Sequence, residues 1–476
     1  MLDLVNKGQL IGWECDESNV PIENYETSVC GKDDAVLPLH RQPWTGISCT
    51  NDRIIAIDLF NRGLTGYLPR SIGLLSDLRE LNLGNNIIYG SIPIELFSIR
   101  NLRYLQLQGN LLSGSIPTSL QYLVNLNVLN LSNNRLTGLI PTAMKSLASL
   151  RTLNFASNKI RGVIPASLFT LRLLTIIELE NNLLTSFPVS ITRIPQNLVT
   201  LSLYSNRIST LPSSVFSLKS VKVMLLHSNI IGSSLPSNIG SLLSIEKLRL
   251  DGNRIRGSIP SSISQLTKLR LLYLYSNSLT SIPSEIGHLI NLEDFQLHQN
   301  WISSTIPTSF GLMTNLVKLT LDFNSIPGSI PDTMDALSKL KFLSMSHNQL
   351  KGSLPRSIAQ AKAIEVMNIG FNQLTGTLHV FCGEGPSLTN LSVCSALALP
   401  QLISLSLQNN YLNGSLPPPL FNDASQLTYL TLNNNLLTGS IPIGQTTPPS
   451  PLYILYLNNN RLSGALPPLS SLNSHS

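Results

Sequence analysis

The side chains best suited to chemistry or to tight binding lie in the middle of this 476-residue chain. They alternate with leucines and recur about every 24 residues. The set comprises Glu178, Glu180, Tyr204, His227, Lys247, Arg249, Asp251, Tyr273, Tyr275, Asp294, His298, Lys318, Asp322 and Phe323. Tyrosine and arginine contribute much of the energy of binding sites because they bury large, rigid, partly polar surfaces. The pattern therefore predicts recognition of a ligand.

The residues predicted to contact that ligand are Tyr204, His227, Arg249, Asp251, Tyr273, Tyr275, His298 and Asp322. Two plainer interpretations stay open. In the first, the side chains are solvated fillers of the surface, because long repeat arrays drift in sequence. Alternatively, Arg249 pairs internally with its neighbour Asp251, and an exposed ion pair contributes only about 0–1 kcal/mol.

Catalysis is not expected. The chain has no G-x-S-x-G nucleophile turn, no G-x-x-x-x-G-K-[ST] phosphate loop and no H-E-x-x-H metal pair. The net charge of +6 is dispersed, without a run of five basic residues, so it favours solubility over nucleic-acid binding. No cofactor and no metal are expected, because the five cysteines show no zinc-ligand spacing.

These side chains belong to a sequence motif that recurs from residue 54 onward. A typical copy is LNLSNNRLTGLIP, from Leu129 to Pro141. Its anchor is an asparagine, and Arg62 takes that place in the first repeat. The anchoring asparagines are Asn86, Asn110, Asn134, Asn158, Asn182, Asn206, Asn229, Asn253, Asn277, Asn300, Asn324, Asn348, Asn372, Asn410, Asn435 and Asn460, which with Arg62 makes 16 + 1 = 17 repeats. A unit this short cannot bury its own apolar face, so the repeats must stack into one solenoid.

The elements of each repeat follow from the spacing of its leucines. Leu129-x-Leu131 places two leucines on one side of a short strand and the side chains between them on the other. The strands are expected to align in parallel into one sheet. The anchoring asparagine can donate to and accept from the backbones of successive coils, so its role is predicted to be structural.

The segment Leu-x-Gly-x-Ile-Pro after the anchor resembles the plant-type subclass of leucine-rich repeats, as found in the ectodomains of receptor-like kinases and receptor-like proteins. Proline follows the anchor in 16 of the 17 repeats, and His379 is the exception. The resemblance implies an α/β repeat solenoid, a leucine-rich repeat superhelix with a concave parallel β-sheet and an irregular, 3-10 convex side. It also implies a second sheet along one flank, interrupted where the repeats of Asn182, Asn206 and Asn277 lack the glycine and one residue.

The resemblance also suggests how the chain is organised. PWTGISC, from Pro43 to Cys49, is similar to the end of the family's amino-terminal cap, so residues 1–53 are predicted to be a cap and 54–476 the solenoid. In that cap Cys49 would pair with Cys30, leaving Cys15 free or bonded to another chain. The long interval before Asn410 predicts an insertion at about 377–400, whose loop a Cys382–Cys394 disulfide would rigidify.

Two functions are expected from this resemblance. The first is the recognition part of a cell-surface receptor, which binds a protein, peptide or oligosaccharide on the concave face and signals through a co-receptor. The second is a soluble interaction scaffold or a wall-associated inhibitor similar to the polygalacturonase inhibitors, although 17 repeats exceed what those arrays are expected to hold.

The compartment depends on weaker signals. The cysteine clusters and the sequons at Asn130, Asn390 and Asn413 favour an extracellular or cell-surface protein. The start of the chain has no signal peptide and no stretch of 18 apolar residues spans a membrane, which allows a cytoplasmic protein or, preferably, a piece of a longer one.

Overall fold

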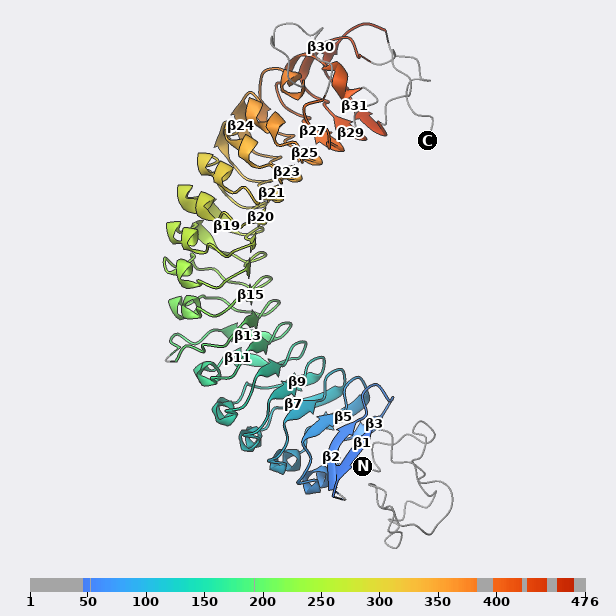
Figure 1. Cartoon of the computed structure of the whole chain (residues 1–476), viewed down its shortest axis with the longest axis vertical. Helices are drawn as coiled ribbons and strands as arrows, with labels where there is room; N and C mark the ends of the chain where they lie inside the picture. The colour runs from blue at the N-terminus through green and yellow to red at the C-terminus, as the bar shows by residue number, and fades with distance from the viewer. Residues whose placement is uncertain are drawn as a thin grey trace. The chain divides into compact units, whose positions relative to one another are not determined.

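The computed structural model describes residues 46–51, 53–191, 193–382, 397–421, 426–442 and 452–465. The chain divides into two compact units, Met1–Ile231 and Gly232–Ser476, which are called the first and the second unit below. In each unit the main strands line one side and short 3-10 helices line the other (Figure 1).

Every repeat with an anchoring residue contributes one main strand. Those of the first unit are β2 (Arg53–Asp58), β4 (Glu80–Asn82), β6 (Tyr104–Gln106), β8 (Val128–Asn130), β10 (Thr152–Asn154), β12 (Ile176–Glu178), β14 (Thr200–Ser202) and β15 (Val223–Leu225). Those of the second unit are β16 (Lys247–Arg249), β18 (Leu271–Tyr273), β20 (Asp294–Gln296), β21 (Lys318–Thr320), β23 (Phe342–Ser344), β25 (Val366–Asn368), β27 (Ser404–Ser406), β29 (Tyr429–Thr431) and β31 (Ile454–Tyr456). Within each unit successive main strands pair in parallel, which confirms the predicted repeat solenoid.

Leucines from the strands and from the opposite side fill the interior between them. Leu129 and Leu131 flank Asn130 on and after β8, and both leucines are buried while Asn130 lies on the other face. The 3-10 helices of the first unit are η2 (Arg70–Leu74), η3 (Ile94–Ser98), η4 (Thr118–Tyr122), η5 (Thr142–Ser146), η6 (Ala166–Thr170) and η7 (Ser213–Ser217). Those of the second unit are η8 (Ile239–Ser241), η9 (Ser261–Gln265), η10 (Ser284–His288), η11 (Thr308–Leu312), η12 (Met334–Ala336), η13 (Arg356–Gln360), η14 (Leu378–Phe381) and η16 (Pro418–Leu420).

The anchoring asparagines hold adjacent coils together. The side-chain amide of Asn110 donates to the carbonyl oxygen of Leu83 in the preceding repeat (2.9 Å) and to that of Leu107 in its own repeat (3.1 Å). Its Oδ1 accepts from the backbone N–H of Ile88, also in the preceding repeat, at 2.9 Å. Asn110 is buried, and the same pattern recurs at the other anchors, such as Asn158 and Asn372. The asparagine side chains therefore satisfy the hydrogen-bonding groups of the buried backbone at these turns, as the sequence predicts.

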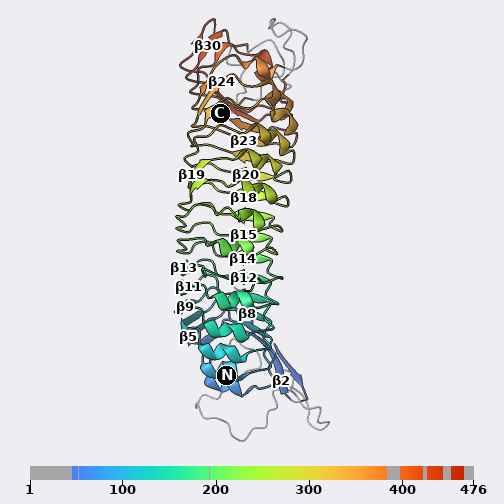
Figure 2. The ribbon, with the colours of Figure 1, turned by 90° about the vertical axis from the view of Figure 1, so that its left-hand side faces the viewer.

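Shorter strands form further sheets on one flank of each unit (Figure 2). Those of the first unit are β3 (Thr65–Tyr67), β5 (Ile87–Ser91), β7 (Leu111–Ser115), β9 (Arg135–Thr137), β11 (Arg161–Val163) and β13 (Leu183–Ser186). Those of the second unit are β17 (Arg256–Ser258), β19 (Ser278–Ser281), β22 (Pro327–Gly328), β24 (Gln349–Gly352), β26 (Gln373–Leu374), β28 (Asn413–Ser415), β30 (Leu436–Gly439) and β32 (Arg461–Leu462). Gly90 shows why glycine recurs here: its φ is +83°, and a Cβ would lie 2.6 Å from the ring of Tyr67.

The predicted interruptions of this flank are found in part. The repeat of Asn206 has no flank strand, as expected. The repeats of Asn182 and Asn277 do form flank strands, β13 and β19, so the prediction is wrong for these two repeats. Each strand pairs with the flank strand of the preceding repeat, with a shift in register. Each of these two sheets ends after that strand. The repeat of Asn300, which follows that of Asn277, also lacks a flank strand.

The insertion does not break the sheet of the second unit. β25 and β27 pair in parallel, from Val366 opposite Ser404 to Asn368 opposite Ser406, across the long interval. Cys382 and Leu397 form an antiparallel bridge, so the chain leaves and re-enters the repeat at one place. A split into two solenoids at this interval is therefore excluded.

The first described strand precedes the repeats. β1 (Ile47–Thr50) pairs antiparallel with β2 and carries Cys49. Cys49 and Cys382 are each disulfide-bonded. The predicted partners Cys30 and Cys394, like Cys15 and most of the cap, lie outside the described residues, so both pairings and the cap boundary stay predictions.

Candidate ligand-binding surface

The surface that each main sheet turns away from the core is called the strand face. It is built by the residues two, four and six positions before each anchor, because these alternate with core leucines. Tyr273 and Tyr275, for example, flank Leu274, which is fully buried. All eight residues predicted to bind a ligand occupy such positions, Tyr204 and His227 in the first unit and the other six in the second.

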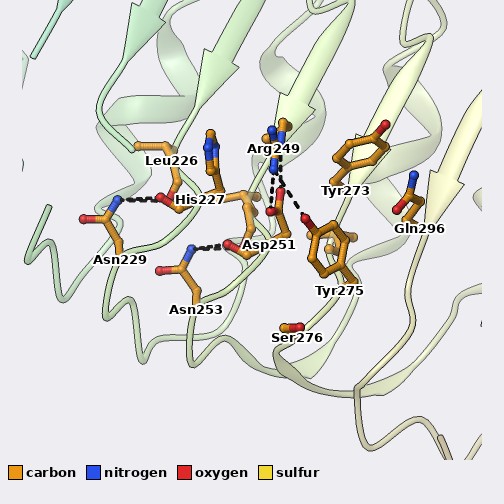
Figure 3. A network of polar contacts seen from close by, with 12 residues as sticks. Leu226, His227, Asn229, Arg249, Asp251, Asn253, Tyr273, Tyr275, Ser276 and Gln296 are labelled. Atoms are coloured by element: carbon orange, nitrogen blue, oxygen red, sulfur yellow. Dashed lines mark hydrogen bonds and ion pairs between the residues drawn. The ribbon is translucent and has the colours of Figure 1, made fainter. Parts of the chain in front are cut away.

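Arg249 organises the strand face of the second unit (Figure 3). Its guanidinium donates to both carboxylate oxygens of Asp251, from Nε at 2.9 Å and from a terminal nitrogen at 2.7 Å. The same terminal nitrogen lies 3.4 Å from the hydroxyl of Tyr275, and the guanidinium carbon lies 5.2 Å from the ring centre of Tyr273. Asp251 is 3% exposed, so this bidentate pair is largely removed from water. The internal pairing that the sequence left open is therefore present.

Tyr273 extends the network to the next strand. Its hydroxyl donates to Oδ2 of Asp294 at 2.6 Å, and the amide of Gln296 donates to Oδ1 of the same carboxylate at 2.9 Å. Burial and the bond to Asp294 raise the pKa of Tyr273 well above its ordinary value of 10.0. The phenol therefore remains protonated at all physiological pH values and holds its ring in one orientation.

His298 completes the set on the far side of Tyr275. The two rings stack with centres 4.3 Å apart and an angle of 10° between their planes. Nδ1 of His298 is hydrogen-bonded to the hydroxyl of Thr320 at 2.9 Å. Burial lowers the pKa of His298 below 6.5, so the imidazole is neutral at pH 7. Arg249, Asp251, Tyr273, Tyr275, Asp294, Gln296 and His298 are together called the Arg249 cluster.

Asp322 is engaged differently. Its Oδ1 accepts from the hydroxyls of Ser344 and Ser346 and from the backbone N–H of Ser346 at 2.9 Å. Three bonds to the next repeat indicate a brace between coils. Its carboxylate is therefore a weaker candidate for ligand contact than the tyrosines.

In the first unit, Tyr204 and His227 stack on each other. Their ring centres are 4.5 Å apart and the ring planes are 11° from parallel. Both residues lie two positions before their anchors on adjacent strands, which is why the rings meet. The stack places two aromatic surfaces side by side on the strand face.

A second aromatic group was only partly visible in the sequence. Phe323, His347 and Phe371 stack in a row, with centres 4.2 and 4.1 Å apart, and they are called the aromatic stack. Each stands directly before its anchor with a positive φ of 53°, 53° and 56°. Most other repeats place Asn, Ser or Gly there, residues that tolerate this conformation better. An aromatic residue at this position could have identified His347 and Phe371 as candidate site residues, but the sequence analysis did not include them.

Other kinds of site are not supported within the described residues. They contain no group of three or more His, Cys, Asp or Glu residues that could hold a metal ion. None of the helices in this part of the chain is long and apolar enough to cross a membrane. Of the predicted glycosylation sites, Asn413 is exposed on β28, Asn130 is half-buried on β8, and Asn390 lies outside the described residues.

Family models of leucine-rich repeats match three parts of the chain. A leucine-rich repeat region matches residues 253–379, a second repeat model matches 124–184, and a third matches 101–123 and 401–422. Two curated Arabidopsis thaliana proteins match short segments. A probable leucine-rich repeat receptor-like protein kinase is 50% identical over 44 residues, and phytosulfokine receptor 1 is 44% identical over 48 residues. These segments cover 9% and 10% of this chain and 5% of each relative.

Solved structures match nearly the whole chain. The plant peptide hormone receptor RGFR1, in complex with RGF2, superposes with a TM-score of 0.77 at 29% identity, covering 90% of this chain and 73% of that one. The Arabidopsis receptor kinase HAESA, in complex with the peptide hormone IDA and the co-receptor SERK1, gives 0.60 at 26%, covering 90% and 83%. A leucine-rich repeat protein of Leptospira interrogans gives 0.63 at 29%, covering 80% and 90%. The family models identify the leucine-rich repeats, and the solved structures show that the fold is similar to that of plant receptor ectodomains.

Proposed function

Because the chain is a leucine-rich repeat protein of the plant type, we propose that it is the recognition domain of a cell-surface receptor and that it binds a peptide. The observation that carries this proposal is the Arg249 cluster. It gathers two tyrosines, a bidentate ion pair and a neutral histidine on one open sheet surface.

The cluster is suited to recognition because it is already ordered. The charges of Arg249 and Asp251 satisfy each other, so a ligand does not have to neutralise a buried charge. Tyr273 and Tyr275 are held by hydrogen bonds and ring contacts, which reduces the entropy lost when a ligand packs against them. Central aromatic residues of this kind are typical binding hot spots.

A peptide is the favoured ligand for two reasons. The cluster draws its side chains from successive parallel strands about 4.8 Å apart, a spacing that an extended chain can follow. RGFR1 and HAESA, which are similar over 90% of this chain, were solved with peptide hormones. The HAESA complex also contains a co-receptor, so we propose that a partner protein joins the ligand-bound chain at the cell surface.

Peptide selection on the full chain tests this function. A displayed library of random 12-residue peptides would be enriched on the wild-type chain, and the enriched peptides would be measured against Tyr273→Ala and Tyr275→Ala. Each substitution is expected to cost about 2 kcal/mol, or roughly 30-fold in affinity. Asn433→Ala, on a main-sheet loop of the same unit, is the matched control and should change affinity little.

The proposal fails if enriched peptides bind the double tyrosine variant as tightly as the wild type. Failure to enrich any peptide, together with binding of an oligosaccharide array, would instead favour a wall-associated protein.

A further inference from the structure

Two glutamates lie close together on the strand face of the first unit. Glu178 ends β12 and Glu180 follows it by two residues, so both side chains leave the same face of the sheet. Among the residues that the structure describes, neither carboxylate forms an ion pair.

The two glutamates differ in how their oxygens are hydrogen-bonded. Oε2 of Glu178 accepts from the side-chain amide of Asn154 at 2.6 Å. Oε2 of Glu180 is buried and has no hydrogen-bond partner. A buried carboxylate oxygen without a donor costs free energy, so the pair is poised to gain from an incoming donor.

The neighbouring strand adds a second buried polar atom without a partner. Ser202 lies directly opposite Glu178 in the parallel pairing of β12 and β14, so its side chain stands on the same face. Ser202 is only 3% exposed, and its hydroxyl has no hydrogen-bond partner. Tyr204, two residues further, brings the ring that stacks on His227 next to Glu180 on this face. Two carboxylates, a hydroxyl and an aromatic ring therefore lie on one part of the strand face, and Glu178, Glu180, Ser202 and Tyr204 are together called the acidic pocket.

We propose that the acidic pocket binds the guanidinium group of an arginine in the peptide ligand. This deepens the proposed function, on which it rests for the existence of a peptide. A guanidinium is favoured over a lysine ammonium because its planar fork can donate two parallel hydrogen bonds to one carboxylate, which an ammonium cannot do. The flat cation also packs against an aromatic ring, which Tyr204 supplies. A divalent metal is disfavoured because the described residues hold no group of three ligands.

The electrostatics of the two glutamates agree with this geometry. Burial, and next the charge of Glu180, raise the pKa of Glu178 above 4.5. Both causes penalise the ionised carboxylate, and the charge of a bound cation would offset this penalty.

A small probe tests the pocket without any knowledge of the natural ligand. Saturation-transfer NMR on the full chain would compare acetyl-arginine amide with acetyl-citrulline amide, which has the same shape but no charge. Transfer to the arginine probe is expected to exceed transfer to citrulline at least threefold. The excess should disappear in the double variant Glu178→Gln/Glu180→Gln and persist in Glu80→Gln, a control that removes an exposed acid from β4 of the same unit.

The selected peptides give the second test. Those enriched on the wild-type chain are expected to share an arginine at a fixed position, and its replacement by citrulline or lysine should weaken binding at least tenfold. The same tenfold loss is expected for Glu178→Gln/Glu180→Gln, whose isosteric side chains preserve the packing, and circular dichroism would verify that the variant is folded.

The outcomes separate the two proposals. If the peptides depend on Tyr273 and Tyr275 but carry no arginine and bind the glutamine variant normally, the pocket is overturned while the receptor function stands. If no peptide is selected but the arginine probe still distinguishes Glu178→Gln/Glu180→Gln from the wild type, the pocket stands without the peptide-receptor function. Equal signals from arginine and citrulline on the wild-type chain would also overturn the pocket.

Discussion

Asparagines occupy two kinds of position in the repeats, and the two kinds have different roles. Asn158 is an anchor whose amide donates to the carbonyl oxygens of Leu131, Phe155 and Ala156, while its Oδ1 accepts from Leu136. Asn154 lies on the strand face, half-buried, and bonds to Glu178 and to the backbone of Ala156. Asn154 therefore makes more hydrogen bonds than the sequence suggested, although its own side chain is only half-buried.

Asn158→Leu is therefore expected to destabilise the chain more than Asn154→Leu. The first change leaves buried backbone groups without partners, at about 1–3 kcal/mol for each group, whereas the second loses hydrogen bonds worth about 1 kcal/mol net. Thermal unfolding of both variants measures the difference. Equal melting temperatures would mean that the anchor is not what closes the coils.

Glu178 gives the stability of the chain a dependence on pH. Because the pKa of Glu178 is raised in the folded chain, its contribution to stability is fully present below about pH 4.5 and is lost as pH rises through the raised pKa. The melting temperature of Glu178→Gln minus that of the wild type should therefore increase between pH 4 and pH 7. Glu80→Gln, which removes an exposed acid, provides the baseline, and a gap that shrinks with rising pH would contradict the prediction.

Which side chains reach the strand face could be predicted from the sequence, because alternation with leucine determines it. How those side chains bond to one another could not. The same type of residue, aspartate, ends as the partner of Arg249 at position 251 and as a brace to two serines at position 322. That choice depends on the register of neighbouring repeats and on rotamers, which a single repeat does not encode.

At the scale of the elements, 3-10 helices of successive repeats pack closely where glycine is present. A Cβ on Gly287 of η10 would lie 2.2 Å from the backbone oxygen of Ser309 in η11. The corresponding position of η13 holds Ala359, which is buried and accommodated. The spacing of the outer side thus differs from one repeat to the next.

Gly287→Ala is expected to cost about 1–3 kcal/mol, because a backbone atom cannot move aside as a side chain can. The reverse change, Ala359→Gly, should cost less, about 0.5–1 kcal/mol, through the greater freedom of glycine in the unfolded chain. Denaturant unfolding followed by circular dichroism compares the two. A smaller loss for Gly287→Ala would show that η10 shifts away from η11 without penalty.

The flank strands show how far the sequence determines these elements. Loss of a residue and of the glycine was expected to end the flank sheet at Asn182 and Asn277, but β13 and β19 still form because they need only the preceding repeat as a partner. The gap appears one repeat later, at Asn206 and Asn300, where the chain offers no matching strand. Whether a flank strand forms depends on two adjacent repeats. The motif of a single repeat therefore predicts the interruption at the wrong place.

At the scale of the whole molecule, the compartment can be tested through modification. Asn413 is exposed on β28, whereas Oδ1 of Asn130 accepts hydrogen bonds from Ser132 on the strand face. If the protein is secreted, glycan occupancy at Asn413 should exceed that at Asn130, because the transferase needs an accessible and mobile amide.

Peptide mapping of the protein isolated from its natural source measures both sites and the cysteines in one experiment. A disulfide joining Cys382 to Cys394 is expected in the same sample. Reduced thiols at both cysteines, with Asn130, Asn390 and Asn413 unmodified, would instead place the protein in the cytosol.

The direction of the asparagine bonds has a consequence for synthesis. Each anchor serves the repeat before it: Asn134 donates to Leu107 and accepts from Leu112, both encoded earlier. On the ribosome the most recently emerged repeat therefore always has bare carbonyl groups, which only the next repeat can cover. At ~5–20 residues per second, a repeat of about 24 residues arrives every one to five seconds, far slower than a short segment can order. The nascent chain should thus grow as a zipper from its amino terminus, with a single unsealed end at every moment of translation.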